Sequence, residues 1–180
     1  MSSNQPRKPA GTPVGGQFAQ MGHADVDIEL KQPQPRNRKP KPSVSNDGTK
    51  RWRLDGQLHR DGAPAVELTN GDKEWYQHGK LHRTDGPAIE YADGTKEWYQ
   101  HGQLHRTDGP AIEYLDGSRV WYQHGQLHRD GGPAIEFPNG TKMWHQHGRL
   151  HRTDGPAFER ANGTKEWWID GKQVDPPIGQ

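Results

Sequence analysis

A tryptophan recurs at a constant interval of 23 residues through most of this 180-residue chain. A fixed short period is typical of a stacked array, in which each unit contacts only its neighbours and shares a thin core with them. We therefore predict a repeat protein in which the tryptophans have a structural role. They are Trp52, Trp75, Trp98, Trp121, Trp144 and Trp167.

The repeat at residues 96–117 shows why the unit should be built from strands. Residues 96–100 are rich in aromatic side chains, which favour strands, and His101-Gly102 fits the two-residue turn of a hairpin. Residues 104–106 would return beside the first strand. Residues 110–114 would then continue in extended form to a second tight turn at Asp116-Gly117. The second turn recurs as Asn70-Gly71, Asp93-Gly94, Asn139-Gly140 and Asn162-Gly163.

Two turns in each repeat leave room for two strands, a short one and a longer one that bends at the Asp-Gly-Pro sequence. The chain is therefore predicted to be all-β, an elongated, twisted antiparallel β-meander of about six hairpin repeats and about twelve strands. Because proline lacks a backbone donor, the ladder should be interrupted at Pro87, Pro110, Pro133 and Pro156. Stacked tryptophans, leucines and alanines should form the apolar spine. The leucines are Leu58, Leu81, Leu104, Leu127 and Leu150, and the alanines are Ala65, Ala88, Ala111, Ala134 and Ala157.

Composition separates the array from its flanks. Only 28% of the residues are hydrophobic and the mean hydropathy is −1.24, values that in an aperiodic chain would indicate disorder. The periodic aromatics argue against disorder for residues 50–175, whereas residues 1–46 contain a single aromatic, Phe18. We predict a flexible, disordered Gly/Pro-rich and basic arm at 1–46, a repeat array at 47–175 and a C-terminal tail at 176–180.

The chain has no cysteine, so disulfides and thiolate metal sites are excluded. No stretch approaches the length of a membrane span, and the N-terminus has no apolar signal region. We expect a cytoplasmic protein, or a virion-associated one if a phage encodes it. The array at 50–180 is close to neutral, so it lacks the basic signature of a nucleic-acid binder.

Residues 31–42 form a distinct basic segment with five basic residues, four prolines and no acid. This composition is typical of an extended, polyproline-like linker. A second interpretation is sequence-independent contact with nucleic acid or another anionic surface through phosphate groups. Both interpretations stay open from the sequence alone.

Pairs of histidines four residues apart, such as His101 and His105, suggest a metal site at first sight. The predicted turn lies between the two members of each pair, so the helical spacing argument fails, and we expect no metal and no cofactor. An enzyme is not expected either, because repetition supplies the same groups several times, whereas an active site needs different groups that converge once.

The best candidate for a contact surface is the ladder of His-Arg pairs, together with the tyrosines beside the tryptophans. Arginine can pair with carboxylate or phosphate and can stack on aromatic rings. The alternative is an internal ion-pair lattice with Asp85, Asp108 and Asp154 or with the glutamates of the same repeats. The candidate partner-binding residues are His82, Arg83, His105, Arg106, His128, Arg129, Tyr76, Tyr99 and Tyr122.

The repeat EWYQHGQLHRTDGPAIEYLDG, residues 97–117, resembles the MORN repeat, and more closely the variant form common in bacteria and their phages. The resemblance covers residues 50–172. It rests on the 23-residue period, the Glu-Trp followed by an x-Gly turn, and the Asp/Asn-Gly turn. The commoner form has Gly-x-Gly where this chain has Leu-His-Arg-Thr-Asp-Gly-Pro, so lipid-binding or dimerisation surfaces are not carried over. The resemblance implies a twisted antiparallel sheet that acts as a scaffold or binding surface.

Three functions follow as hypotheses. The first is a non-enzymatic scaffold or binding module with a protein partner, encoded by a phage or mobile element. The second is an antitoxin or immunity-type inhibitor, because a branch of the bacterial variant is described as antitoxin-like. The third is a virion or assembly structural protein anchored by its N-terminal arm.

Overall fold

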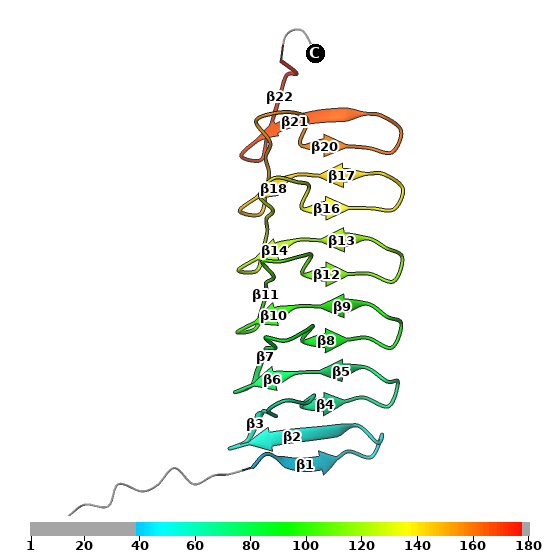
Figure 1. Cartoon of the computed structure of the whole chain (residues 1–180), viewed down its shortest axis with the longest axis vertical. Coiled ribbons are helices and arrows are strands. Elements are labelled where there is room, and N and C mark those ends of the chain that lie inside the picture. Colours follow the sequence, from blue (N-terminus) through cyan, green and yellow to red (C-terminus); the bar gives the residue numbers. More distant parts are fainter. Residues whose placement is uncertain (1–38, 178–180) are drawn as a thin grey trace, which may run out of the picture. The chain divides into compact units, whose positions relative to one another are not determined.

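The computed structural model describes residues 39–177. Within this range the chain forms strands and turns, and no helix is present (Figure 1). The predicted all-β class is confirmed: the repeats form one antiparallel meander in which hairpin follows hairpin. The expectations for residues 1–38 and 178–180 lie outside the described residues.

Each repeat contributes one hairpin to a main ladder and a second, smaller hairpin beside it (Figure 1). The main ladder runs β1 (Lys41–Val44), β2 (Lys50–Leu54), β4 (Val66–Glu67), β5 (Lys73–Glu74), β8 (Ile89–Glu90), β9 (Lys96–Glu97), β12 (Ile112–Glu113), β13 (Arg119–Val120), β16 (Ile135–Glu136), β17 (Lys142–Met143), β20 (Phe158–Glu159), β21 (Lys165–Ile169) and β22 (Lys172–Val174). The smaller hairpins join β6 (Tyr76–Gln77) to β7 (Lys80–Leu81), β10 (Tyr99–Gln100) to β11 (Gln103–Leu104), β14 (Tyr122–Gln123) to β15 (Gln126–Leu127), and β18 (His145–Gln146) to β19 (Arg149–Leu150), while β3 (Gln57–Leu58) pairs with β2.

The two turns of the repeat have different geometries. His78 and Gly79 have φ angles of 48° and 74°, and they connect β6 to β7 as the predicted two-residue turn. At the other turn only the glycine has a positive φ, 96° for Gly94. There Gly94 N–H donates to the Tyr91 carbonyl and Tyr91 N–H donates to the Thr95 carbonyl. The Asp-Gly turn is therefore a three-residue loop whose glycine takes the left-handed position.

The expected long, bent strand is replaced by shorter pieces. The ladder reaches as far as the pair formed by Trp75 N–H and the Ala88 carbonyl, at 2.8 Å. The residue before Ala88 is Pro87, which has no N–H, so the ladder stops there as predicted. Beyond Trp75 the chain turns away and pairs β6 with β7 instead, which produces the smaller hairpin.

The array begins earlier than predicted, so the assignment of residues 1–46 to the arm is wrong at its C-terminal end. β1 pairs antiparallel with β2, with Pro42 opposite Trp52. The sequence signal was present, because Asp47-Gly48 precedes Asn70-Gly71 by one full repeat. Pro42 is tolerated because β1 is an edge strand.

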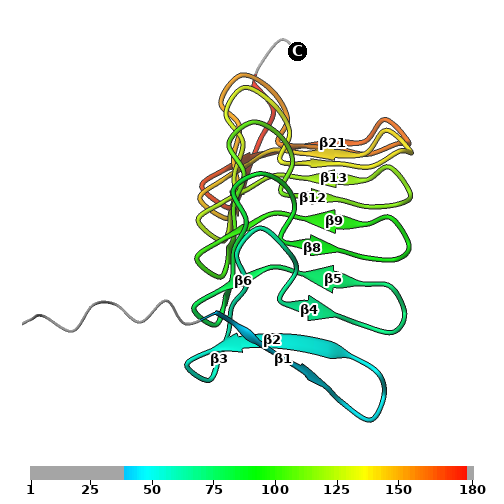
Figure 2. The ribbon, with the colours of Figure 1, turned by 60° about the horizontal axis from the view of Figure 1, so that its bottom comes forward.

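The buried core is made of smaller side chains than the predicted spine of tryptophans, leucines and alanines. The alanine ladder is completely buried and Val66, Ile89 and Ile112 nearly so, but no large side chain among the described residues is fully buried. Trp75 is 9% exposed, and the other repeat tryptophans and the leucine ladder are only half-buried. All extensive contacts between strands join hydrogen-bonded neighbours, and the smaller hairpins lie beside the main ladder along its length (Figure 2).

Candidate interaction surface

An arginine clamp organises each repeat that contains a His-Arg pair. The Arg106 guanidinium carbon lies 4.0 Å from the centroid of the Trp98 ring, a cation–π distance. Its Nη1 donates to the Pro110 carbonyl and to Glu113, at 3.2 and 3.0 Å, and its Nε donates to Asp108 at 2.9 Å. The Asp-Gly-Pro loop folds back because this one side chain ties it to the strand and the indole. The equivalent stacked pairs are Arg60 on Trp52, Arg83 on Trp75, Arg129 on Trp121 and Arg152 on Trp144.

A shift of the loop aspartate by one position changes its partner. Where the sequence reads His-Arg-Thr-Asp-Gly, the aspartate accepts from the arginine Nε, as in Arg83 with Asp85. Where it reads His-Arg-Asp-Gly, the aspartate lies 3.3 Å from the histidine Nε2 instead, as in His128 with Asp130. The Arg129 Nη1 still donates to Glu136 at 2.7 Å. The arginine clamp therefore forms with both loop sequences. Only the second sequence places a carboxylate beside the histidine.

The histidine before each arginine is an internal connector. His82 is 9% exposed, and its Nδ1 accepts a hydrogen bond of 3.2 Å from the backbone N–H of His101 in the next repeat. A ring nitrogen that accepts from a backbone N–H is unprotonated, so this imidazole is neutral and carries its proton on Nε2. The same bond recurs from His78 to His59, from His124 to His105 and from His147 to His128.

The two histidines of each such pair also touch through their rings. The ring centroids of His82 and His101 are 4.6 Å apart. Burial lowers the pKa of His82, and the neighbouring His101 lowers it further. For the same reasons, burial first and His124 second, the pKa of His105 is lowered. Burial and charge repulsion thus favour the neutral form that the hydrogen bond requires.

These contacts support the internal ion-pair lattice that the sequence left as the alternative to a His-Arg contact surface. His82, His105 and His128 are buried, so their rings are not presented to a partner. Arg83, Arg106 and Arg129 are held in internal clamps, which is the alternative of an ion-pair lattice with Asp85, Asp108 and Asp154 and the glutamates. Residue spacing alone did not reveal this, because it does not say on which side of the chain the loop folds back.

The sheet face that carries the clamps is electrically balanced. Directly opposite residues in an antiparallel ladder share a face, and here bases and acids alternate along the whole ladder. The Arg Nη1 atoms add a further partner to each glutamate of the clamps. The alternating row is Lys50, Glu67, Lys73, Glu90, Lys96, Glu113, Arg119, Glu136, Lys142, Glu159 and Lys165.

The opposite face of the sheet is aromatic and acidic. Its ladder residues include Ile89, which lies opposite both Glu74 and Glu97. Side chains alternate along the strands, so the tyrosines two residues from these positions point to the same side. We call this set the tyrosine face, and it consists of Tyr76, Tyr91, Tyr99, Tyr114 and Tyr122 with Glu74 and Glu97.

Electrostatic coupling shows that the tyrosine face is one cluster. Burial, and then the Glu97 carboxylate, raise the pKa of Tyr91 to about 12, and its hydroxyl lies 3.5 Å from the Glu97 Oε1. Burial and Glu74 raise the pKa of Tyr76 to about 12. The pKa of Tyr99 is raised by burial, by Glu97 and by the neighbouring Tyr91 and Tyr122. All of these phenols therefore remain neutral hydrogen-bond donors at physiological pH.

The tyrosine face also carries exposed side chains. Tyr114 is 44% exposed and Phe137, its equivalent in the next repeat, is 39% exposed. Tyr76, Tyr99 and Tyr122, which the sequence marked as candidates, are half-buried on this face. Four residues of this face were not predicted from the sequence: Tyr91, Tyr114, Glu74 and Glu97. Strict alternation along the strands from the candidate tyrosines indicates the two glutamates.

The structure also bears on metals and membranes within residues 39–177. No group of three or more His, Asp or Glu side chains there has the arrangement of a metal site. No helix in that range is long and apolar enough to cross a membrane. Comparisons with protein-family models and with curated proteins find no match.

Proposed function

We propose that this chain is a non-enzymatic repeat scaffold that binds a partner protein through the tyrosine face. The observation that carries the proposal is the row of aromatic side chains on one sheet face, of which Tyr114 and Phe137 are 44% and 39% exposed. Tyrosine is enriched at protein interfaces, because its ring contributes a large apolar contact area and its hydroxyl still finds a hydrogen bond.

The charges of the tyrosine face favour a partner with a basic surface. Glu74 and Glu97 lie among the phenols, while Arg83 and Arg106 are held in the clamps on the other face. A lysine or arginine of a partner would meet carboxylates and aromatic rings together, which combines ion pairing with cation–π contact. The clamp face offers no comparable excess of one charge.

The size of the tyrosine face suits a protein interface. From β5 to β13 the ladder has five strands in sequence. At ~4.8 Å between strands this spans roughly 20–25 Å. A typical interface buries about 800 Å² on each partner, a patch roughly 28 Å on a side. The tyrosine face alone therefore supplies the central part of such a contact.

Site-specific photo-cross-linking tests the proposal in an extract of the native host. A benzophenone amino acid is placed at Tyr114 on the tyrosine face or, as the matched control, at the exposed Lys96 on the clamp face. We expect a protein adduct from position 114 that excess unlabelled protein competes away, with its cross-linked segment rich in lysine or arginine. Equal adducts of one and the same protein from both positions, or none from position 114, would contradict the proposal.

A further inference from the structure

A row of polar grooves lies between successive repeats on the clamp face. Each groove is bounded by the Asp-Gly-Pro loop of one repeat and by the tryptophan of the next, for example Arg106–Gly109 and Trp121. The equivalent grooves have volumes of about 470 Å³ at Trp98, 470 Å³ at Trp121 and 240 Å³ at Trp144. Trp98 and Gln100 alternate with Tyr99, so the grooves and the tyrosine face lie on opposite sides of the chain.

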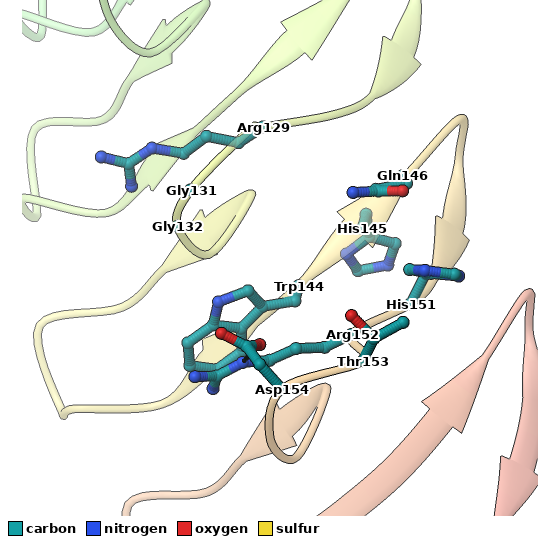
Figure 3. A pocket seen from close by; sticks show the side chains of 10 residues that line it. All are labelled: Arg129, Gly131, Gly132, Trp144, His145, Gln146, His151, Arg152, Thr153 and Asp154. Atoms are coloured by element: carbon teal, nitrogen blue, oxygen red, sulfur yellow. Dashed lines mark hydrogen bonds and ion pairs between the residues drawn. The ribbon is translucent and has the colours of Figure 1, made fainter.

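Each groove combines a fixed indole with hydrogen-bond donors. Figure 3 shows the Trp144 indole with Arg152 along one side and the Gly131-Gly132 loop across the gap. Arg152 keeps this ring in place, with its guanidinium carbon 4.2 Å from the centroid. Glutamine side chains at the groove edge add amide donors, and they are Gln100, Gln123 and Gln146.

The clamp leaves part of each guanidinium unused. Arg83 and Arg106 donate through Nε and Nη1, and within residues 39–177 neither Nη2 has a partner. Arg129 donates through Nη1 only, because Gly131 stands where the other loops have aspartate. The loop aspartates direct one carboxylate oxygen at Nε or at a histidine, and their side chains are 79–81% exposed. The Nη2 atoms and the glutamine amides are the groove donors left for a ligand that supplies acceptors.

The spacing of the grooves selects the conformation of such a ligand. Each repeat adds two strands to the main ladder, so successive grooves are separated by two strand spacings, ~9.4–9.8 Å. A polyproline II helix has three residues per turn and a rise of 3.1 Å, so every third residue recurs at about 9.3 Å. An extended β-strand repeats one face at ~6.6–6.8 Å, which is out of step with the grooves.

We propose that this row of grooves binds a proline-rich segment of a partner protein in the polyproline II conformation, with one turn for each groove. Prolines lack N–H groups and their carbonyls are not used inside the helix, so such a segment presents acceptors to the arginine and glutamine donors. Every third side chain packs against an indole, as in other aromatic grooves that recognise proline-rich peptides. This site is independent of the tyrosine face.

Oligoproline peptides of about three, six, nine and twelve residues, one to four turns, serve as the probe, with glycine-serine peptides of equal length as the control. Titration calorimetry and tryptophan fluorescence of the full chain report binding. We expect affinity to rise with each added turn up to the length that fills the row, and no saturable binding of the glycine-serine peptides.

Matched variants locate the site. Gln100→Ala with Gln123→Ala removes groove donors that have no hydrogen bond within residues 39–177. Gln103→Ala with Gln126→Ala changes the residues paired with them in the same hairpins, which do not line the grooves. We expect the first pair to weaken oligoproline binding about tenfold, since two hydrogen bonds are lost, and the second pair to change it by less than about twofold.

Three results would overturn the proposal. They are absence of saturable oligoproline binding, equal binding of the glycine-serine peptides, and equal weakening by the two glutamine pairs. Substitution of Tyr114 by Ala should leave oligoproline binding unchanged, so failure of this proposal is distinguishable from failure of the tyrosine face.

Discussion

The backbone N–H of His101 donates a hydrogen bond of 3.2 Å to the Nδ1 of His82, across the boundary between two repeats. This bond requires a neutral imidazole, and burial of His82 favours the same form. Repetition of the bond along the array makes the contact between repeats depend on several titratable groups at once. Stability of the stack should therefore depend on pH.

We expect the array to lose stability on mild acidification. The pKa values of His82 and His105 are lowered in the folded chain relative to the ordinary value of 6.5. Their contribution is therefore complete above pH ~6.5 and is lost as the pH falls from there through the folded-state pKa. Urea unfolding followed by tryptophan fluorescence between pH 8 and about pH 5 measures the effect.

The control for this pH dependence is the double variant His82→Asn with His105→Asn. An asparagine carbonyl can accept the backbone hydrogen bond but does not titrate. We expect a flatter dependence of the unfolding free energy on pH in this variant. A dependence as steep as that of the unmodified chain would show that other groups cause it. Two further histidines, His59 and His128, face Asp61 and Asp130 at 3.3 Å and are left unchanged in the test.

Arg106→Gln should destabilise the array by about 1–3 kcal/mol. The estimate allows for one cation–π contact and hydrogen bonds of a partly exposed charged group, discounted for solvent screening. Arg106→Lys should restore only part of the loss, because an ammonium cannot bind Glu113 and Asp108 with two separate nitrogens. Urea midpoints at constant m-value provide the measurement. Unchanged midpoints would mean that the clamp does not stabilise the loop.

Gly109→Ala should lower stability only when Arg106 is present. A Cβ at position 109 would lie 2.8 Å from the Arg106 guanidinium carbon, and the backbone there does not have a positive φ. The substitution should therefore displace the guanidinium without straining the chain. In a double-mutant cycle, we expect Gly109→Ala to destabilise the unmodified chain clearly and the Arg106→Gln variant much less. Additive effects would contradict this steric explanation.

Removal of β1 should lower stability, although the sequence analysis assigned its residues to a disordered arm. β1 pairs with β2 along four residues and covers its outer edge. A chain that begins at Ser45 should therefore unfold at lower urea concentration than a chain that begins at Lys39. Equal midpoints for the two chains would mean that β1 adds no net stability. The comparison also separates the ordered edge from the segment that lies outside the described residues.

More of the fold than of the exposed surface could be predicted from the sequence. The 23-residue register indicates a stack of identical units, and His78-Gly79 fixes a two-residue hairpin turn because both residues accept positive φ. The Asp-Gly pair predicts the position of the second turn but not the number of residues in its loop. Asp-Gly occurs both in two-residue hairpin turns and in three-residue loops, in which a type I turn is followed by glycine. The equivalent pair Asp47-Gly48 would have placed β1 as well.

The sequence by itself determined the period, the all-β class and the sites of the turns, because these depend on local backbone preferences that repeat with the residues. The tertiary structure alone decided which periodic side chains are buried. The ladder stops at Ala88, where Pro87 supplies no donor, and the loop then folds back over the indole of Trp75. That fold places His82 and Arg83 inside the stack and leaves Tyr114 exposed. Burial depends on contacts between residues far apart in the chain, and a spacing of residues does not specify them.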